Sequence, residues 1–188
     1  MDNNIVKWRT CPARMDYFLM SKIMNKEKLE FSDISCYFPF DLRILDIDDE
    51  VYCVTGLEPP FLKCVGGEDN ITVSIPVFEC RPILRPMCDL HKPLEDGSIP
   101  IIRLAEIAFP NHKWTLWQNI AVYMDKIGLI EAKFNYQINE NYFMHTFKNG
   151  GSVKNLLQLF AYLNKHHFDH SGLVNKNLAV NINVLNHG

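Results

Sequence analysis

The pair Cys88 and His91 has a spacing at which one turn of chain can present two ligands to a zinc ion. A tetrahedral zinc site needs two further ligands, for which Cys64 or Cys80 would have to approach from another part of the chain. No Cys-x-x-Cys pair occurs anywhere in the sequence. We therefore expect these thiols to be small buried side chains, and we predict no metal ligands.

Three histidines, His166, His167 and His170, follow a stretch with helical periodicity. His166 and His170 could share one face if the helix continued through them. A metalloprotease helix carries Glu directly after its first histidine, and His167 occupies that place here. Because cationic side chains interact favourably with a helix C-terminus, we interpret these residues as capping or solvated histidines.

A run of acidic residues lies between two predicted strands. Carboxylate oxygens are ligands that Mg²⁺ accepts, so the run could hold that ion. Such a run between strands more often forms a solvated turn, and this is the interpretation that we adopt. The residues are Asp46, Asp48, Asp49 and Glu50.

One further acidic pattern, Asp69 followed by Glu79-x-Arg81, resembles the restriction-endonuclease-like nucleases, in which an acidic residue precedes an E-x-K strand. Arg81 stands where that family has Lys. The sequence contains no G-x-S-x-G, no Walker-type loop and no G-x-G-x-x-G. We therefore predict no catalytic residues and no cofactor, and we expect that the protein is not an enzyme.

The composition is that of an ordinary globular protein: 188 residues, 47% hydrophobic, with a mean hydropathy of -0.10. No apolar run reaches the roughly 18 residues that a membrane helix needs, and the first residues lack the apolar core of a secretion signal. We expect a cytoplasmic protein without membrane contact, whose six cysteines are reduced.

Charge is unevenly distributed along the chain. Residues 29–97 carry fourteen Asp and Glu against five Lys and Arg, whereas residues 98–188 carry five against eight. Six of the seven histidines also lie in the second half. An acidic first half repels a polyanion, so nucleic acid, if bound, is expected at the second half.

Hydrophobic periodicity and turn residues predict an α+β fold in two parts. The first part, residues 1–97, is β-rich and acidic and has one N-terminal helix. The second part, residues 98–188, follows a proline-rich boundary within 76–100, and the alternative is that both parts pack as one unit. Predicted helices cover 12–28, 101–109, 115–127 and 153–167, and predicted strands cover 42–47, 51–55, 70–80, 132–138, 142–147 and 178–185.

The order of elements from Ser98 to Lys148 is a short helix, a break, a second helix and two strands. It resembles the winged helix-turn-helix family, with RLAEIA as the first helix, TLWQNIAVYMDKI as the recognition helix, and GLIEAKFNYQ with NYFMHTF as the wing. In that family the second helix lies in the DNA major groove. The resemblance implies a contact surface for nucleic acid or a protein partner made of Lys113, Trp114, Gln118, Asn119, Lys126 and Lys133.

These features favour a non-enzymatic binding protein, a regulator or adaptor that contacts nucleic acid or a protein partner through a winged-helix-like surface. The alternative is a structural or assembly subunit of a larger complex such as a virion, which would form oligomers. Asn and Ile are abundant, with 17 of each, and Ala is scarce, with 7. That bias is compatible with the AT-rich coding of some phages and mobile elements.

Overall fold

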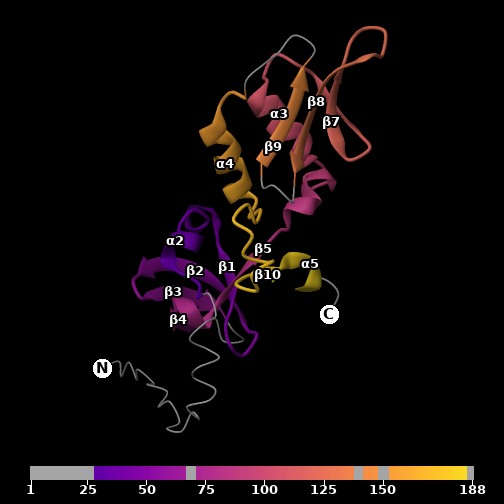
Figure 1. Cartoon of the computed structure of the whole chain (residues 1–188). Coiled ribbons are helices and arrows are strands. Elements are labelled where there is room, and N and C mark those ends of the chain that lie inside the picture. Colours follow the sequence, from indigo (N-terminus) through magenta and orange to yellow (C-terminus); the bar gives the residue numbers. More distant parts are fainter. Residues whose placement is uncertain (1–27, 67–70, 138–141, 148–152, 186–188) are drawn as a thin grey trace, which may run out of the picture.

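The computed structural model describes residues 28–66, 71–137, 142–147 and 153–185. Two antiparallel-rich sheets lie at opposite ends of an elongated molecule, and helices accompany both (Figure 1). Strands cover more of the chain than helices do, so the mixed α+β class is confirmed, with sheets dominating. The helix predicted over 12–28 lies outside the described residues except for Lys28.

The first sheet has six strands in the order β10-β5-β1-β2-β3-β4. Alternating burial along β2 and β3 places Tyr52, Val54, Leu62 and Cys64 in one core, as expected for a sheet with one covered face. The predicted strands over 42–47 and 51–55 are confirmed. The strand predicted over 70–80 is shorter than expected, because it ends at Pro76 as β4, the last strand of the sheet, and Val77–Glu79 form a 3-10 turn. The bounds are β1 Arg43–Leu45, β2 Val51–Glu58, β3 Phe61–Gly66, β4 Ile71–Pro76, β5 Arg81–Leu84 and β10 Val180–Asn181.

The second sheet has four strands in the order β6-β7-β8-β9, all antiparallel. Helices α3, Pro100–Ala108, and α4, Leu156–Lys165, pack on one of its faces. Residues paired in register share a face, which places Trp114, Tyr123, Ala132 and Phe147 together on the helix side. The strands are β6 Trp114–Trp117, β7 Ile120–Met124, β8 Ile130–Gln137 and β9 Tyr142–Phe147.

The helix predicted over 115–127 is wrong, because these residues form the hairpin of β6 and β7. The two strands meet at Gln118 and Asn119, whose φ angles of 48° and 64° are those of a two-residue hairpin turn. Trp, Thr, Ile, Val and Tyr in this stretch are residues that strands favour. The winged-helix order over 98–148 therefore lacks its second helix, while its first helix and its wing correspond to α3 and to the β8–β9 hairpin.

The C-terminal strand predicted over 178–185 is mostly wrong. Only Val180 and Asn181 form β10, and helix α5, Ile182–Leu185, follows directly. The Asn181 side chain accepts a hydrogen bond from the Asn183 backbone N–H at 2.9 Å, which favours a helical turn over a continued strand. Strand β10 belongs to the first sheet, because it pairs in parallel with β5.

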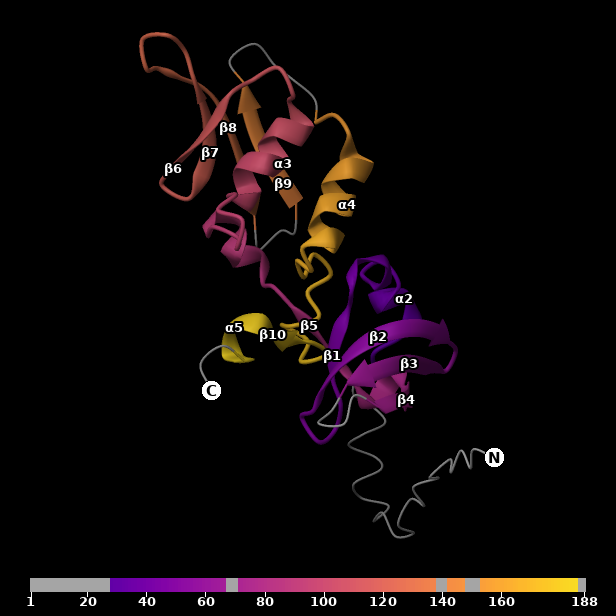
Figure 2. The ribbon, with the colours of Figure 1, turned by 180° about the vertical axis from the view of Figure 1, so that it is seen from behind.

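The two halves are joined by the segment that follows α4. The backbone N–H of Arg85 donates to the carbonyl of His167 at 2.7 Å, and the N–H of Asp169 donates back to the carbonyl of Arg85 at 2.8 Å. The buried Tyr37 hydroxyl donates to the carbonyl of Phe168 at 3.0 Å. Figure 2 shows from behind how the chain after β5 and this segment run between the two sheets.

The short helices complete the two cores. Helix α2, Phe31–Ile34, and the 3-10 turns η1, Phe38–Phe40, and η2, Val77–Glu79, lie in the first half. Turn η3, Met87–His91, contributes Met87 and Leu90 to the core of the second half. Along the chain, the first core ends at Leu84 and the second begins at Met87, while Leu173 and Ala179 belong again to the first core.

Candidate functional site

A cavity of about 330 Å³ opens between α4 and the strands β8 and β9. This volume is at the lower end of those that bind ligands in proteins, and its wall is apolar and aromatic apart from one histidine. The lining residues come from three elements and from the segments that flank α4. They are Tyr136, Tyr142, Phe143, Val153, Leu156, Phe160, Leu163 and His170, which we call the α4 groove.

Helix α4 carries apolar side chains over more of its circumference than it buries. Leu159 and Leu163 are fully buried against the sheet. Leu156, Leu157 and Phe160 are 55%, 85% and 40% exposed. A helix that covers a single core usually turns polar residues to solvent. The exposed leucines and phenylalanine therefore extend the α4 groove outward as an apolar surface.

His170 is the one basic side chain in the lining of the groove. Its Nε2 lies 2.7 Å from Oδ1 of Asn164, and its ring lies 5.4 Å from Phe160 and 5.7 Å from Tyr37, measured between centroids. Burial lowers the pKa of His170, and the nearby Asp169 only partly opposes this. The imidazole is therefore neutral at neutral pH, and none of the lining side chains carries a fixed charge.

The six residues implied by the winged-helix resemblance do not form one surface. Gln118 and Asn119 lie at one end of β7 and Lys126 at the other, and Lys133 lies on the sheet face opposite the helices. These four and Lys113 are exposed. Trp114 is 3% exposed, because its ring packs 5.9 Å from that of Phe109 and its indole N–H donates to the Phe109 carbonyl at 3.5 Å.

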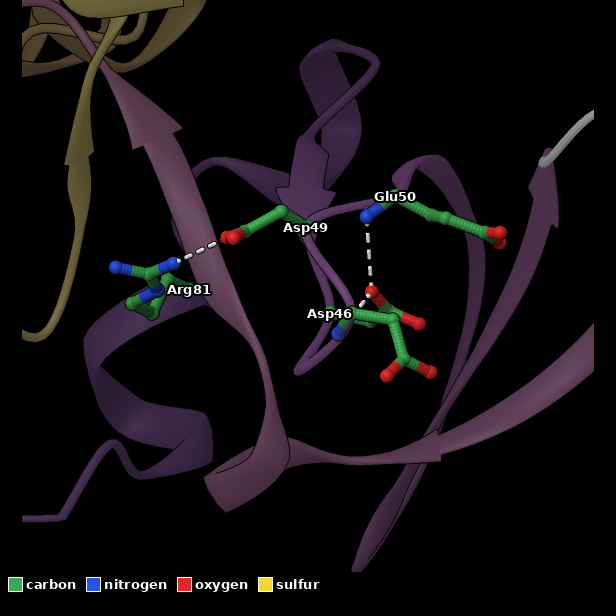
Figure 3. Close-up of polar contacts among 5 residues, drawn as sticks. Asp46, Asp49, Glu50 and Arg81 are labelled. Atoms are coloured by element: carbon green, nitrogen blue, oxygen red, sulfur yellow. Dashed lines mark hydrogen bonds and ion pairs between the residues drawn. The ribbon is translucent and has the colours of Figure 1, made fainter.

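The acidic run forms the solvated turn that the sequence predicts, between β1 and β2. The Asp46 carboxylate accepts the backbone N–H groups of Asp48 and Glu50, each at 2.9 Å, and Asp49 binds Arg81 at 2.7 Å (Figure 3). The Asp46 carboxylate thus binds backbone groups of the turn itself. Glu79 is exposed on η2, and Arg81 forms an ion pair with Asp49, so Glu79 and Arg81 do not face a common site. Asp69 lies outside the described residues.

The cysteine and histidine candidates also lie apart. Cys64 and Cys80 are buried in the first core, as expected of structural thiols, whereas Cys88 is exposed on η3 with its Sγ 3.8 Å from the Asp89 carboxylate. His166 faces the Tyr162 ring and His170 faces Asn164. Among the residues that the structure describes, no group of three or more His, Cys, Asp or Glu is placed to hold a metal ion.

Sequence reasoning did not single out any residue of the α4 groove except His170. The groove joins strands and a helix that are separated along the chain, so periodicity could not predict it. One signal was present, because the segment Leu156-Leu157-x-x-Phe160 places apolar residues outside the stripe that Leu159 and Leu163 define.

No family model, no curated protein and no solved structure matches the chain. Within the described part of the chain, no helix has the length and apolar character needed to cross a membrane.

Proposed function

We propose that this chain is a non-enzymatic binding protein, a regulator or adaptor, that receives an apolar segment of a protein partner in the α4 groove. The observation that carries the proposal is the continuity between the cavity and the exposed Leu156, Leu157 and Phe160. Contiguous exposed apolar surface on a soluble protein marks interaction sites. Aromatic residues at the centre and few charges are the composition of an interface core.

A protein partner is favoured over nucleic acid by the distribution of cations. Binding to a phosphate backbone requires several Lys or Arg side chains on one surface. Lys113, Lys126 and Lys133 are interspersed with Asp125 and Glu131, and the buried Trp114 offers no stacking face. A subunit of a larger assembly would use the same groove, with another subunit as its partner.

The test is site-specific photo-crosslinking in cells of the source organism. A benzophenone side chain replaces Leu157, which is 85% exposed and adjoins the groove-lining Leu156, or Thr115, which is exposed on the opposite face of the sheet as a matched control. We expect crosslinks to protein from position 157 only, and their loss when Phe160→Glu places a carboxylate in the groove.

Crosslinks that are equal at both positions, or that survive Phe160→Glu, would remove the groove from the proposal. A complementary measurement is the binding of random-sequence duplex DNA at low salt. Tight binding that weakens in Lys126→Ala and Lys133→Ala, and that is unaffected by Phe160→Glu, would favour the nucleic-acid function instead.

A further inference from the structure

Exposed cations lie at both ends of helix α4, while the carboxylate beside the groove lining, that of Asp169, is buried and accepts the backbone N–H groups of Leu173 and Val174. Lys154 adjoins Val153 of the groove and Lys165 ends α4, so one cation lies at each end of the helix; Lys133 lies on the other face of the sheet. The groove is therefore suited to an apolar side chain flanked by carboxylates.

The same chain presents that combination at the turn between β1 and β2. Ile47 is 68% exposed and is followed directly by the exposed Asp48, Asp49 and Glu50. The Asp46 carboxylate holds the turn through the two backbone N–H bonds described above, and the ion pair of Asp49 with Arg81 ties the turn to β5. Because the turn is already ordered, binding through it costs little further conformational entropy.

The turn cannot reach the groove of its own molecule. Strand β5 begins beside the turn, where Arg81 pairs with Leu45 and binds Asp49. It leads away from the turn to Arg85, which is hydrogen-bonded to the segment that follows α4. The turn and the groove thus lie toward opposite ends of the molecule (Figure 1).

We propose that the acidic β1–β2 turn of one copy docks into the α4 groove of a second copy, with Ile47 in the cavity and the carboxylates facing Lys154 and Lys165. This inference rests on the proposed function and names the partner as another molecule of the same chain. The two contacting surfaces differ, so the interface is heterologous, and repetition of it builds a ring or an open filament rather than a two-fold dimer.

The test uses sedimentation velocity of the full chain over a wide concentration range at low salt. We expect the wild type to form species larger than a dimer as concentration rises, and added salt to dissociate them. Ile47→Asn in the turn and Phe160→Glu in the groove should each weaken self-association at least about tenfold. Both side chains are exposed, and unchanged thermal unfolding would verify that each variant folds.

Mixing the two variants gives the decisive measurement. Ile47→Asn retains an intact groove and Phe160→Glu an intact turn, so an equimolar mixture can form one interface and should stop at a heterodimer. The matched control is Ile127→Asn, which removes a 79% exposed isoleucine from the β7–β8 turn beside Lys126 and should leave assembly unchanged.

Three results would overturn the inference: a wild type that stays monomeric, association that is insensitive to Ile47→Asn, or variants that do not complement each other. Association lost in Phe160→Glu but unaffected by Ile47→Asn would indicate groove-to-groove dimers. A monomeric wild type whose position 157 still crosslinks to a different protein would contradict self-assembly and leave the proposed function standing.

Discussion

Replacing Gln118 with glycine should stabilise the protein, because this residue occupies the first position of the β6–β7 turn with a φ of 48°. A left-handed backbone costs a residue with a side chain about 1–2 kcal/mol, which glycine avoids. Glycine in turn destabilises the folded protein by about 0.5–1 kcal/mol, because the unfolded chain has greater conformational freedom at that position. The net gain expected in the free energy of unfolding is therefore between about 0 and 1.5 kcal/mol.

The sign of this change tests the hairpin directly. In the helix that the sequence predicts over 115–127, the same substitution would lie in the interior and would destabilise by about 1 kcal/mol. Gln158→Gly is the matched control, because Gln158 is exposed within α4 and should show that loss. Urea titrations of the three proteins give the differences, provided that the slope with denaturant is unchanged. A loss in Gln118→Gly equal to that in Gln158→Gly would refute the hairpin.

Three other perturbations have expected outcomes that urea titration can check. Asp169→Asn should lower the free energy of unfolding by about 1–3 kcal/mol, because the 6% exposed carboxylate accepts the N–H groups of Leu173 and Val174, each at 2.8 Å. An amide can replace only one of these two acceptors. Asp46→Asn, in an exposed turn, should lower the free energy of unfolding by less. Gly66→Ala should cost about 1–3 kcal/mol, since its new Cβ would lie 2.6 Å from the Val51 carbonyl oxygen, whereas at Gly56 the nearest atom is a side-chain carbon at 3.3 Å and the cost should be smaller. Burial lowers the pKa of His166, His167 and His170, so below a pH of about 6.5 the unfolded chain binds more protons than the folded one. The free energy of unfolding should therefore be highest above that pH and fall as the pH drops through the lowered pKa values. The double variant His167→Gln with His170→Gln should lose less stability over the same pH range. Each of these explanations has a result that would contradict it. For the carboxylates and for the glycines, that result is an equal loss of stability in the two variants of the pair. For the histidines, it is a pH dependence of stability that the substitutions leave unchanged.

Sequence patterns could predict only some residues of the α4 groove. His170 drew attention by its type, and the apolar repeat of α4 was visible in the sequence. The groove itself depends on Tyr136 and Phe143, which lie opposite each other in register on β8 and β9, facing the helix side of the sheet. Strand pairing and the packing of α4 on the sheet are long-range contacts, so no local window contains them.

A helix is predicted over both 101–109 and 115–127, but only the first stretch forms one, and this difference has a physical explanation. The first stretch begins with Pro100 at a helix start and ends before Pro110, and these local restrictions on the backbone do not depend on the rest of the fold. The second stretch has apolar residues that fit a helical arc and also fit two paired strands. Pairing of β7 with β8 decides between the alternatives, since it buries Ala121 and Val122 completely.

By itself, the sequence determined the mixed α+β class, the strands β1, β2, β8 and β9, helices α3 and α4, and the solvated character of the acidic turn. Each of these follows from local periodicity, from proline or from a short turn. The tertiary structure alone decided that residues 114–124 are a hairpin, that Trp114 is buried and that β10 returns to the first sheet. It also decided where the apolar surface of α4 and the acidic turn lie, because those positions depend on contacts between distant parts of the chain.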